Sequence, residues 1–185
     1  MSWVGRIEER IGIAAPPHRV FAWLDDPQHT GLHMNRPSLA MGGGRLRVER
    51  LSTDATGEGA TYRSSGHVFG LRIDFTTTVV CWVRDREKVW RTTGEPRLVV
   101  IRHFEMGFAT AALDSGTDLT LALAYDLPAR GVGRLLGRLL ARPYARWCVR
   151  RIVRDSQVAL GGAPSGTATH DPNGDRSGRG WRWTR

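Results

Sequence analysis

The sequence predicts an α+β domain in which a curved antiparallel sheet of six to seven strands surrounds one long C-terminal helix. Alternating segments from residue 45 to residue 125 are joined by short turns rather than by helices, so neighbouring strands must run antiparallel. The only long helical pattern, residues 132–160, is also the only element large enough to cover one face of that sheet. A strongly twisted sheet wrapped on a single helix commonly leaves a cavity, and cavities bind small ligands.

The chain opens with a strand pattern that is followed by two short helical patterns. Residues 3–13 alternate between apolar and polar side chains, as expected of a strand with one buried face. Pro17 suits the first turn of a helix over residues 18–24, because the missing N–H of proline is harmless there. The Asp-Asp-Pro sequence at 25–27 ends this helix, and residues 29–38 are interpreted as a second short helix.

Six further strand patterns follow. They span residues 45–51, 59–66, 71–83, 89–93, 98–113 and 119–125. The clearest is 71–83, in which every second residue from Leu71 to Val83 is apolar or threonine and is predicted to face the interior. The pattern over 98–113 is apolar on one face except for Arg102.

The C-terminal helical pattern contains a proline, Pro143, and its apolar residues change direction there. Leucines and Val132 form the apolar set before the proline, whereas Tyr144, Trp147 and Ile152 belong to the set after it. At about 100° per residue, the second set is rotated well away from the first. This predicts a kink, or two helices that meet, near Pro143.

The chain is long enough for one domain with a substantial core, and we assign residues 1–160 to it. From residue 161 the composition changes to Gly, Ser, Thr, Asp, Asn and Arg, so residues 161–185 are predicted to be a disordered basic tail. Trp181 and Trp183 alternate with arginine in this tail. Such residues could stack on bases, settle at a membrane interface or have no function.

Composition indicates a cytoplasmic protein. No apolar run approaches the roughly 18 residues of a membrane-spanning helix. The first residues show no apolar core of a secretory signal. The two cysteines, Cys81 and Cys148, are too few for a disulfide framework and are expected to be reduced.

Positive charge is concentrated in the C-terminal helix. The formal net charge of the chain is +9, and residues 129–160 contain eight arginines against one acid, Asp155. Such a helix could meet an anionic membrane surface or a nucleic acid. The arginines from Arg134 to Arg154 mostly recur every four residues, drift by about 40° at each step and therefore wind around the helix. A solvated face, in a chain whose only lysine is Lys88, is the simpler interpretation.

Several segments, taken in order, resemble a known family. They are APPHRVFAWL at 15–24, GATYR at 59–63, VWRTTG at 89–94, SGTDLT at 115–120, GRLLGRLL at 133–140 and ARWCVRR at 145–151. In these segments the chain resembles the START/SRPBCC superfamily, whose helix-grip fold is shared with birch-pollen-type allergens, and within it the bacterial polyketide cyclase/dehydrase and lipid-transport branch. The resemblance covers about residues 3–160. It implies a hydrophobic pocket for a lipid, a polyketide, an isoprenoid or another aromatic molecule, but it does not imply catalysis.

We expect three residues to make polar contacts with a ligand. Arg102 interrupts an apolar face, and a buried guanidinium needs a partner; a strand end or a bulge would instead turn it to solvent. Tyr62 and Ser64 share the inner face of their strand and could hydrogen-bond a ligand, although a backbone group could equally satisfy Tyr62. The predicted aromatic walls, which could equally be ordinary core residues, are Phe75, Trp90, Phe104, Phe108, Tyr125, Tyr144 and Trp147.

No metal site and no cofactor are expected. His29 and His33 are four residues apart, but a zinc-protease motif needs glutamate directly after the first histidine, where this chain has Thr30. His103 and Glu105 share a strand face that should be solvent-exposed, so we interpret them as a surface pair.

Three functions are consistent with the sequence, and binding is favoured over catalysis because no catalytic constellation is evident. The first is a carrier or sensor of a hydrophobic small molecule. The second is an aromatase or cyclase that acts on a polyketide-like chain, with Arg102, Tyr62 and Ser64 as candidates to orient it. The third is a module that binds an anionic membrane or a nucleic acid through the arginine-rich helix and the tail, although no specific nucleic-acid partner is expected.

Overall fold

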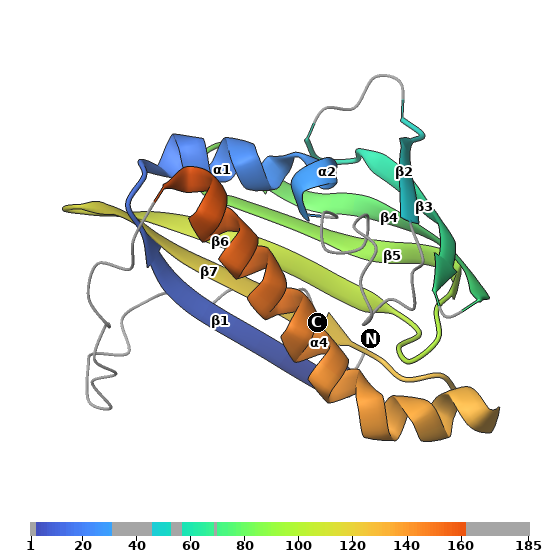
Figure 1. The fold of residues 1–185 in the computed structure, drawn as a ribbon. Coiled ribbons are helices and arrows are strands. Elements are labelled where there is room, and N and C mark those ends of the chain that lie inside the picture. Colours follow the sequence, from blue (N-terminus) through green and yellow to red (C-terminus); the bar gives the residue numbers. More distant parts are fainter. Residues whose placement is uncertain (1–2, 31–45, 53–56, 69, 162–185) are drawn as a thin grey trace.

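The computed structural model describes residues 3–30, 46–52, 57–68 and 70–161 (Figure 1). In chain order the elements are β1 (Gly5–Ile13), α1 (Pro17–Asp25), α2 (Pro27–Thr30), β2 (Leu46–Arg50), β3 (Thr61–Val68), β4 (Leu71–Val83), β5 (Glu87–Arg97), β6 (Phe104–Leu113), β7 (Gly116–Tyr125) and α4 (Gly131–Leu160). The predicted fold class is confirmed, with seven strands, short helices after the first strand and a long helix at the end. The predicted tail beyond Gly161, and the second helix beyond Thr30, lie outside the described residues.

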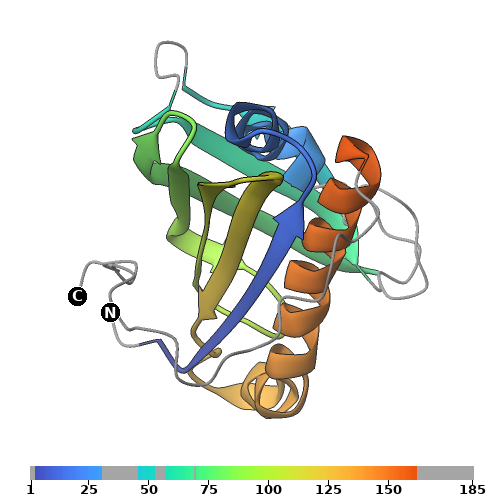
Figure 2. The same ribbon diagram turned by 90° about the vertical axis from the view of Figure 1, so that its left-hand side faces the viewer.

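The seven strands form one antiparallel sheet in the order β1-β7-β6-β5-β4-β3-β2. Consecutive strands from β2 to β7 pair with one another, as the short turns predict. β1 pairs with β7 from Gly5 opposite Tyr125 to Ile13 opposite Thr117, so the first and last strands of the chain lie side by side. The sheet is strongly curved, with α1 across one end and α4 along its concave side (Figure 2).

A stripe of small and apolar residues fixes α4 to the rest of the domain. Ala141, Ala145, Cys148, Val149 and Ile152 are all buried, and the helix contacts β1, β7 and α1. The two alanines let the helix backbone approach its neighbours closely, and the larger residues fill the core beyond them. The stripe therefore anchors α4 from Ala141, just before the proline, through the second half of the helix.

The predicted kink at Pro143 is confirmed. α4 is one continuous helix of 30 residues with Pro143 in its interior. Its first turns run at an angle to the remainder and project beyond the sheet (Figures 1 and 2). Proline bends a helix because it lacks an N–H and because its ring meets the carbonyl four residues earlier, here that of Leu139.

β4 keeps the predicted alternation only as far as Val79. Every second residue from Ile73 to Val79 is buried. The pairing of β4 with β5 shifts between Val79 and Cys81, and a bulge reverses the face that the following residues present. Beyond it Trp82 packs against the core and Val83 is exposed, so the prediction that Val83 faces the interior is wrong.

The predicted strand over 98–113 is divided. β5 continues to Arg97, and β6 begins only at Phe104. The irregular segment between them is held to the chain that follows β7, because the Arg102 N–H donates to the Asp126 carbonyl and the Asp126 N–H donates to the His103 carbonyl, both at 2.8 Å. Because this segment is not a strand, the alternation of side chains between the two faces of the sheet does not continue through it.

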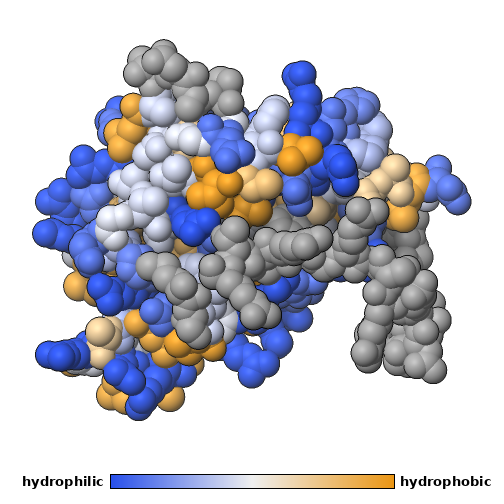
Figure 3. All heavy atoms as spheres, turned by 180° about the vertical axis from the view of Figure 1, so that it is seen from behind, coloured by the Kyte–Doolittle hydropathy of each residue, from blue (hydrophilic) through white to orange (hydrophobic). Residues whose placement is uncertain are grey.

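The side of the molecule turned away from α4 carries many hydrophilic residues and separate apolar patches (Figure 3). Ion pairs link neighbouring strands on the outer face, for example Arg63 on β3 with Asp74 on β4 at 2.7 Å. Within the described residues, no helix combines the length and the apolar character needed to cross a bilayer.

Candidate functional site

A cavity of about 390 Å³ lies between the sheet and α4. Its walls come from α2, all strands from β2 to β7, the irregular segment at 98–101, and α4. This volume is in the range of small-molecule sites and has room for roughly a dozen water-sized groups. A compact molecule of two or three rings would fit within this volume.

Apolar side chains make up most of the wall. The first half of α4 contributes Leu136 and Leu140, and four consecutive apolar residues line the cavity at 98–101. Phe75 and Phe104 meet edge to face across the sheet, with ring centroids 5.6 Å apart. A ligand in this space would be held mainly by apolar burial, at about 25 cal/mol for each Å² removed from water.

Three hydroxyl groups interrupt the apolar wall along β3 and β4. Tyr62 and Ser64 are on β3, and Thr77 is opposite Tyr62 on β4. The described part of the chain gives none of these hydroxyls a hydrogen-bond partner. Hydroxyl groups in such a position are expected to bind water or a ligand. The period of the strand predicts that Thr77 faces inward, but no local signal indicates that it reaches a cavity.

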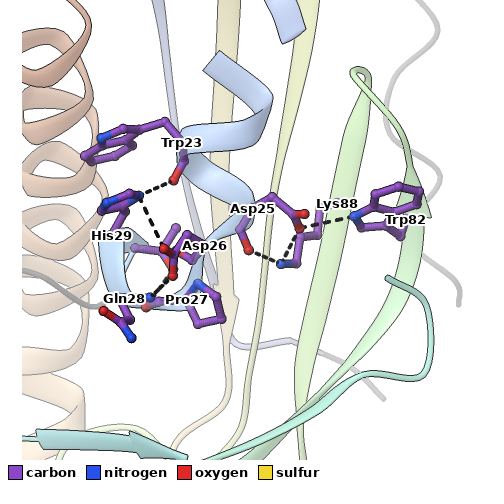
Figure 4. Close-up of polar contacts among 9 residues, drawn as sticks. Trp23, Asp25, Asp26, Pro27, Gln28, His29, Trp82 and Lys88 are labelled. Carbon is purple, nitrogen blue, oxygen red and sulfur yellow. Dashed lines mark hydrogen bonds and ion pairs between the residues drawn. The ribbon is translucent and has the colours of Figure 1, made fainter. Parts of the chain in front are cut away.

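Lys88 on β5 is the one basic residue in the described wall of the cavity. It is only 5% exposed, and its Nζ donates to the backbone oxygen and to Oδ1 of Asp25, each at 2.7 Å (Figure 4). Oδ1 of Asp25 also accepts a hydrogen bond from Trp82 Nε1 at 3.1 Å. Nζ lies 6.0 Å and 5.8 Å from the ring centroids of Tyr62 and Trp90, two walls of the cavity.

The corner between α1 and α2 holds Asp25 in place. Asp26 accepts a hydrogen bond from the Gln28 N–H at 2.8 Å, which fixes the start of α2 (Figure 4). His29 stacks on Trp23 with ring centroids 4.7 Å apart, and its Nδ1 lies 2.9 Å from the Trp23 carbonyl oxygen. The short helix α2 therefore has a defined position, from which it supplies part of the cavity wall.

The α4 side of the cavity presents neutral donors. Burial raises the pKa of the Cys148 thiol to about 12, and burial raises the pKa of the Tyr144 phenol well above its usual value. Burial also raises the pKa of Tyr62 on the opposite wall. All three groups are protonated at neutral pH, so none of them supplies a base to the cavity.

A sequence model of one family matches almost the whole domain. The model, described as polyketide cyclase / dehydrase and lipid transport, matches residues 5–159. The chain belongs to this family. No curated protein matches the chain significantly.

Solved structures of several other proteins have the same fold. TTHA0849 from Thermus thermophilus is 16% identical, with a TM-score of 0.63 over 84% of this chain and 97% of that one. Ara h 8.0201 is 10% identical, with a TM-score of 0.56 over 84% and 97%. The Zhui aromatase/cyclase from Streptomyces sp. R1128 is 22% identical, with a TM-score of 0.51 over 84% and 87%. At these identities the likeness establishes the helix-grip fold alone.

In the present structure, six of the ten predicted site residues line the cavity. They are Tyr62, Ser64, Phe75, Trp90, Phe104 and Tyr144. Their contact with a ligand stays a prediction. Each belongs to a regular element whose period places it on the inner side.

Three predicted aromatic walls lie elsewhere. Phe108 is fully buried in the core, with its ring centroid 5.4 Å from that of Phe21. The Tyr125 ring covers the backbone of Gly5 on the neighbouring strand, where a side chain would collide with it. Trp147 lies half-buried on α4, with its ring centroid 6.2 Å from that of Tyr144. These three fill space around the cavity rather than form its described wall.

Arg102 does not point into the interior, and that prediction is wrong. Its guanidinium pairs with Glu95 at 3.3 Å on the surface, and neither side chain is buried. The reason is the break between β5 and β6. The prediction assumed that side chains alternate between the two faces throughout residues 98–113, but the strand begins only at Phe104, after Arg102. The neighbouring residues of that irregular segment, 98–101, supply the cavity wall instead.

The interpretation of His103 and Glu105 as a surface pair is also wrong. Both are buried, and Glu105 pairs with Arg91 on β5 at 3.3 Å, while His103 Nδ1 lies 3.3 Å from Thr92 Oγ1. Burial raises the pKa of Glu105, although the Arg91 guanidinium opposes this shift. Neither residue is in the described cavity wall. Among the described residues no three His, Cys, Asp or Glu side chains come together as a metal site would require.

Proposed function

We propose that this protein binds a hydrophobic small molecule in the cavity between the sheet and α4, as a carrier or sensor. The observation that carries the proposal is an apolar cavity of about 390 Å³ with a few hydroxyl groups to which the described residues offer no hydrogen-bond partner. Such an arrangement holds a ligand by apolar burial and orients it by hydrogen bonds. A polyketide, an isoprenoid or another ring-containing lipid of compact size has the required shape.

A cyclase or aromatase role is the less favoured alternative. Such a reaction needs a base to take a proton from the bound chain, within about 3 Å of the acidic carbon. In the described wall, Tyr62, Tyr144 and Cys148 are protonated at neutral pH, and that wall includes no carboxylate. The carboxylate of Asp25, which pairs with the wall residue Lys88, is engaged by Lys88 and Trp82. This set of groups suits retention of a ligand better than proton abstraction.

The test is thermal unfolding with a panel of naphthalenes, quinones and aromatic polyketides. A true ligand raises the midpoint in proportion to the logarithm of its concentration above Kd. Two neighbouring serines of β3 provide a matched pair of variants, because Ser64 lines the cavity and Ser65 is on the opposite face. Ser64→Phe should abolish the shift and Ser65→Phe should keep it. Equal shifts in both variants would place the ligand outside the cavity.

A second candidate function, contact with an anionic membrane, is favoured by the first half of α4. Val132, Leu135 and Leu139 are 74%, 62% and 67% exposed there. At about 100° per residue they share one arc of the helix with Leu136 and Leu140, which line the cavity, and the arginines take another arc. Orange and blue residues accordingly lie together at the lower left of Figure 3, where the first turns of α4 project. Exposed apolar residues beside arginine are typical of interfacial helices.

Vesicle sedimentation tests this second function. The protein should bind phosphatidylcholine vesicles only when phosphatidylglycerol is included, and added salt should weaken the binding. Replacement of Leu135 and Leu139 by serine should abolish it, whereas Val158→Ser, a change at an exposed apolar residue near the other end of α4, should not. Binding that is unaffected by the leucine changes would contradict this role for α4.

A further inference from the structure

We propose that Lys88 makes the cavity specific for an uncharged ligand that carries a hydrogen-bond-accepting oxygen, such as a ketone or quinone carbonyl. The inference rests on the proposed function and adds the chemical class of the ligand to it. Lys88 is the only lysine of the chain, and it is 5% exposed in the wall of a mostly apolar cavity.

The hydrogen bonds of the Lys88 ammonium leave one donor for a ligand. An ammonium has three N–H groups and accepts nothing. Asp25 takes two of them through its backbone oxygen and Oδ1, each at 2.7 Å from Nζ. Within the described residues no other acceptor bonds to Nζ. The third N–H is therefore available beside the rings of Tyr62 and Trp90, which both line the cavity.

The position of Asp25 at the end of α1 fixes the ammonium. Its carbonyl belongs to the last turn of α1 (Pro17–Asp25), where the helix dipole favours a cation. Its carboxylate is held in turn by Trp82 Nε1 at 3.1 Å (Figure 4). Lys88 is thus oriented before a ligand arrives, so little side-chain entropy is lost when the third N–H donates.

Charge balance decides between an anionic and a neutral ligand. Lys88 and Asp25 form an ion pair at 2.7 Å, so the charge of the ammonium is already balanced by a carboxylate. A carboxylate ligand would lose its hydration in the apolar cavity and would be repelled by Asp25. A carbonyl oxygen loses much less hydration and still accepts a charge-assisted hydrogen bond. A hydrocarbon would leave the third N–H of Lys88 without a partner.

Arginine cannot replace Lys88 in this role. A guanidinium has five N–H donors in a fixed planar fork, and Asp25 offers two acceptors in the structure. The remaining donors would be left in apolar surroundings. The Lys88→Arg variant should therefore lack the preference for a carbonyl ligand that we expect of the wild type.

Three naphthalenes of nearly equal size separate the classes of ligand. They are 2-acetylnaphthalene, which carries a ketone, 2-isopropylnaphthalene, which replaces the ketone oxygen by a methyl group, and 2-naphthoate, which is an anion. Titration with the wild-type protein should give the tightest binding for the ketone. Lys88→Met should weaken ketone binding by about tenfold and should not weaken isopropylnaphthalene binding, because that hydrocarbon makes no hydrogen bond to Lys88. The exposed neighbour Arg84, changed to Met, is the control and should behave as the wild type.

A measurement on the wild-type protein keeps the inference testable if Lys88→Met does not fold. Because the chain has one lysine, ¹⁵N-labelled lysine gives a single Nζ signal, which should shift with the ketone and not with isopropylnaphthalene. Equal affinity for these two compounds, or tightest binding of 2-naphthoate, would overturn the assignment to Lys88 while leaving a hydrophobic site in place. If none of the three bound, the proposed function itself would be contradicted.

Discussion

Two glycines one turn apart in α4 make the packing of its first half directly testable. A Cβ at Gly137 would lie 2.7 Å from the Val100 carbonyl oxygen and 3.1 Å from Leu127 Cδ2. A Cβ at Gly133 would have its nearest neighbour, Pro128 Cβ, at 3.5 Å, an ordinary van der Waals distance. Substitution by alanine should therefore be less favourable at Gly137 than at Gly133.

The magnitudes follow from two opposing effects. In a helix interior, Gly→Ala stabilises by about 0.8–1.0 kcal/mol because alanine loses less backbone entropy. At Gly133 nothing opposes this gain, so Gly133→Ala should stabilise the protein by up to about 1 kcal/mol. At Gly137 the methyl group would overlap a backbone oxygen, and overpacking costs about 1–3 kcal/mol. Gly137→Ala should therefore be less stable than Gly133→Ala by about 1–3 kcal/mol, or roughly 2–4 °C in Tm for each kcal/mol.

Urea denaturation and thermal melts measure this difference. The change at Gly137 should also weaken binding of 2-acetylnaphthalene, because displacement of α4 from Val100 moves Leu136 and Leu140, which line the cavity. Binding to Gly133→Ala should match the wild type. If both variants gained the same stability, the close approach of α4 to segment 98–101 would be refuted, and with it this account of the cavity wall.

Other predictions concern buried polar groups. Thr117 is fully buried and its Oγ1 donates to the Ala15 carbonyl at 2.6 Å, so Thr117→Val should cost about 1–3 kcal/mol of unfolding free energy; an unchanged urea midpoint would contradict this. Iodoacetamide should alkylate Cys81 well before Cys148, because Cys81 is half-buried and the pKa of Cys148 is about 12; mass spectrometry of partly alkylated protein gives the order, and equal rates would argue against a buried Cys148. Burial raises the pKa of Glu105, so the folded state binds its proton more tightly than the unfolded chain does. This contribution to stability is complete below the unfolded pKa of about 4.3 and is lost as the pH rises through the raised folded value. Glu105→Gln should therefore lose less stability than the wild type as the pH rises above about 4.3 in urea titrations, and parallel pH profiles would rule out the raised pKa.

The regular parts of the cavity wall were predictable because their signals are local. Tyr62, Ser64 and Phe75 belong to strands in which the side of each residue follows from a period of two, so position in the sequence gives position on the sheet. The same argument failed for Arg102. Its alternation was continued across a segment whose conformation is set by hydrogen bonds with Asp126, a residue that the local pattern does not include.

Lys88 shows what the sequence could not reveal. It follows a charged turn, and in the sequence it is distinguished only as the single lysine among many arginines. Its partner Asp25 is 63 residues away in the chain, and the bulge after Val79 alters the pairing of the strand beside it. The partner has no local signal. The inward direction follows from the period of two that links Lys88 to Trp90, but the strand pattern begins at residue 89 and does not include Lys88.

By itself the sequence determined the kinds of element, their order and the antiparallel sheet closed by a C-terminal helix. Periods of 2 and 3.6 residues and short turns are properties of neighbouring residues, so they can be read along the chain. Only the tertiary structure decided the size of the cavity. It also decided that the irregular segment at 98–101 and the ammonium of Lys88 belong to the cavity wall. Those features depend on contacts between segments that are distant in the sequence, and no local pattern of residues gives the free energy of such contacts.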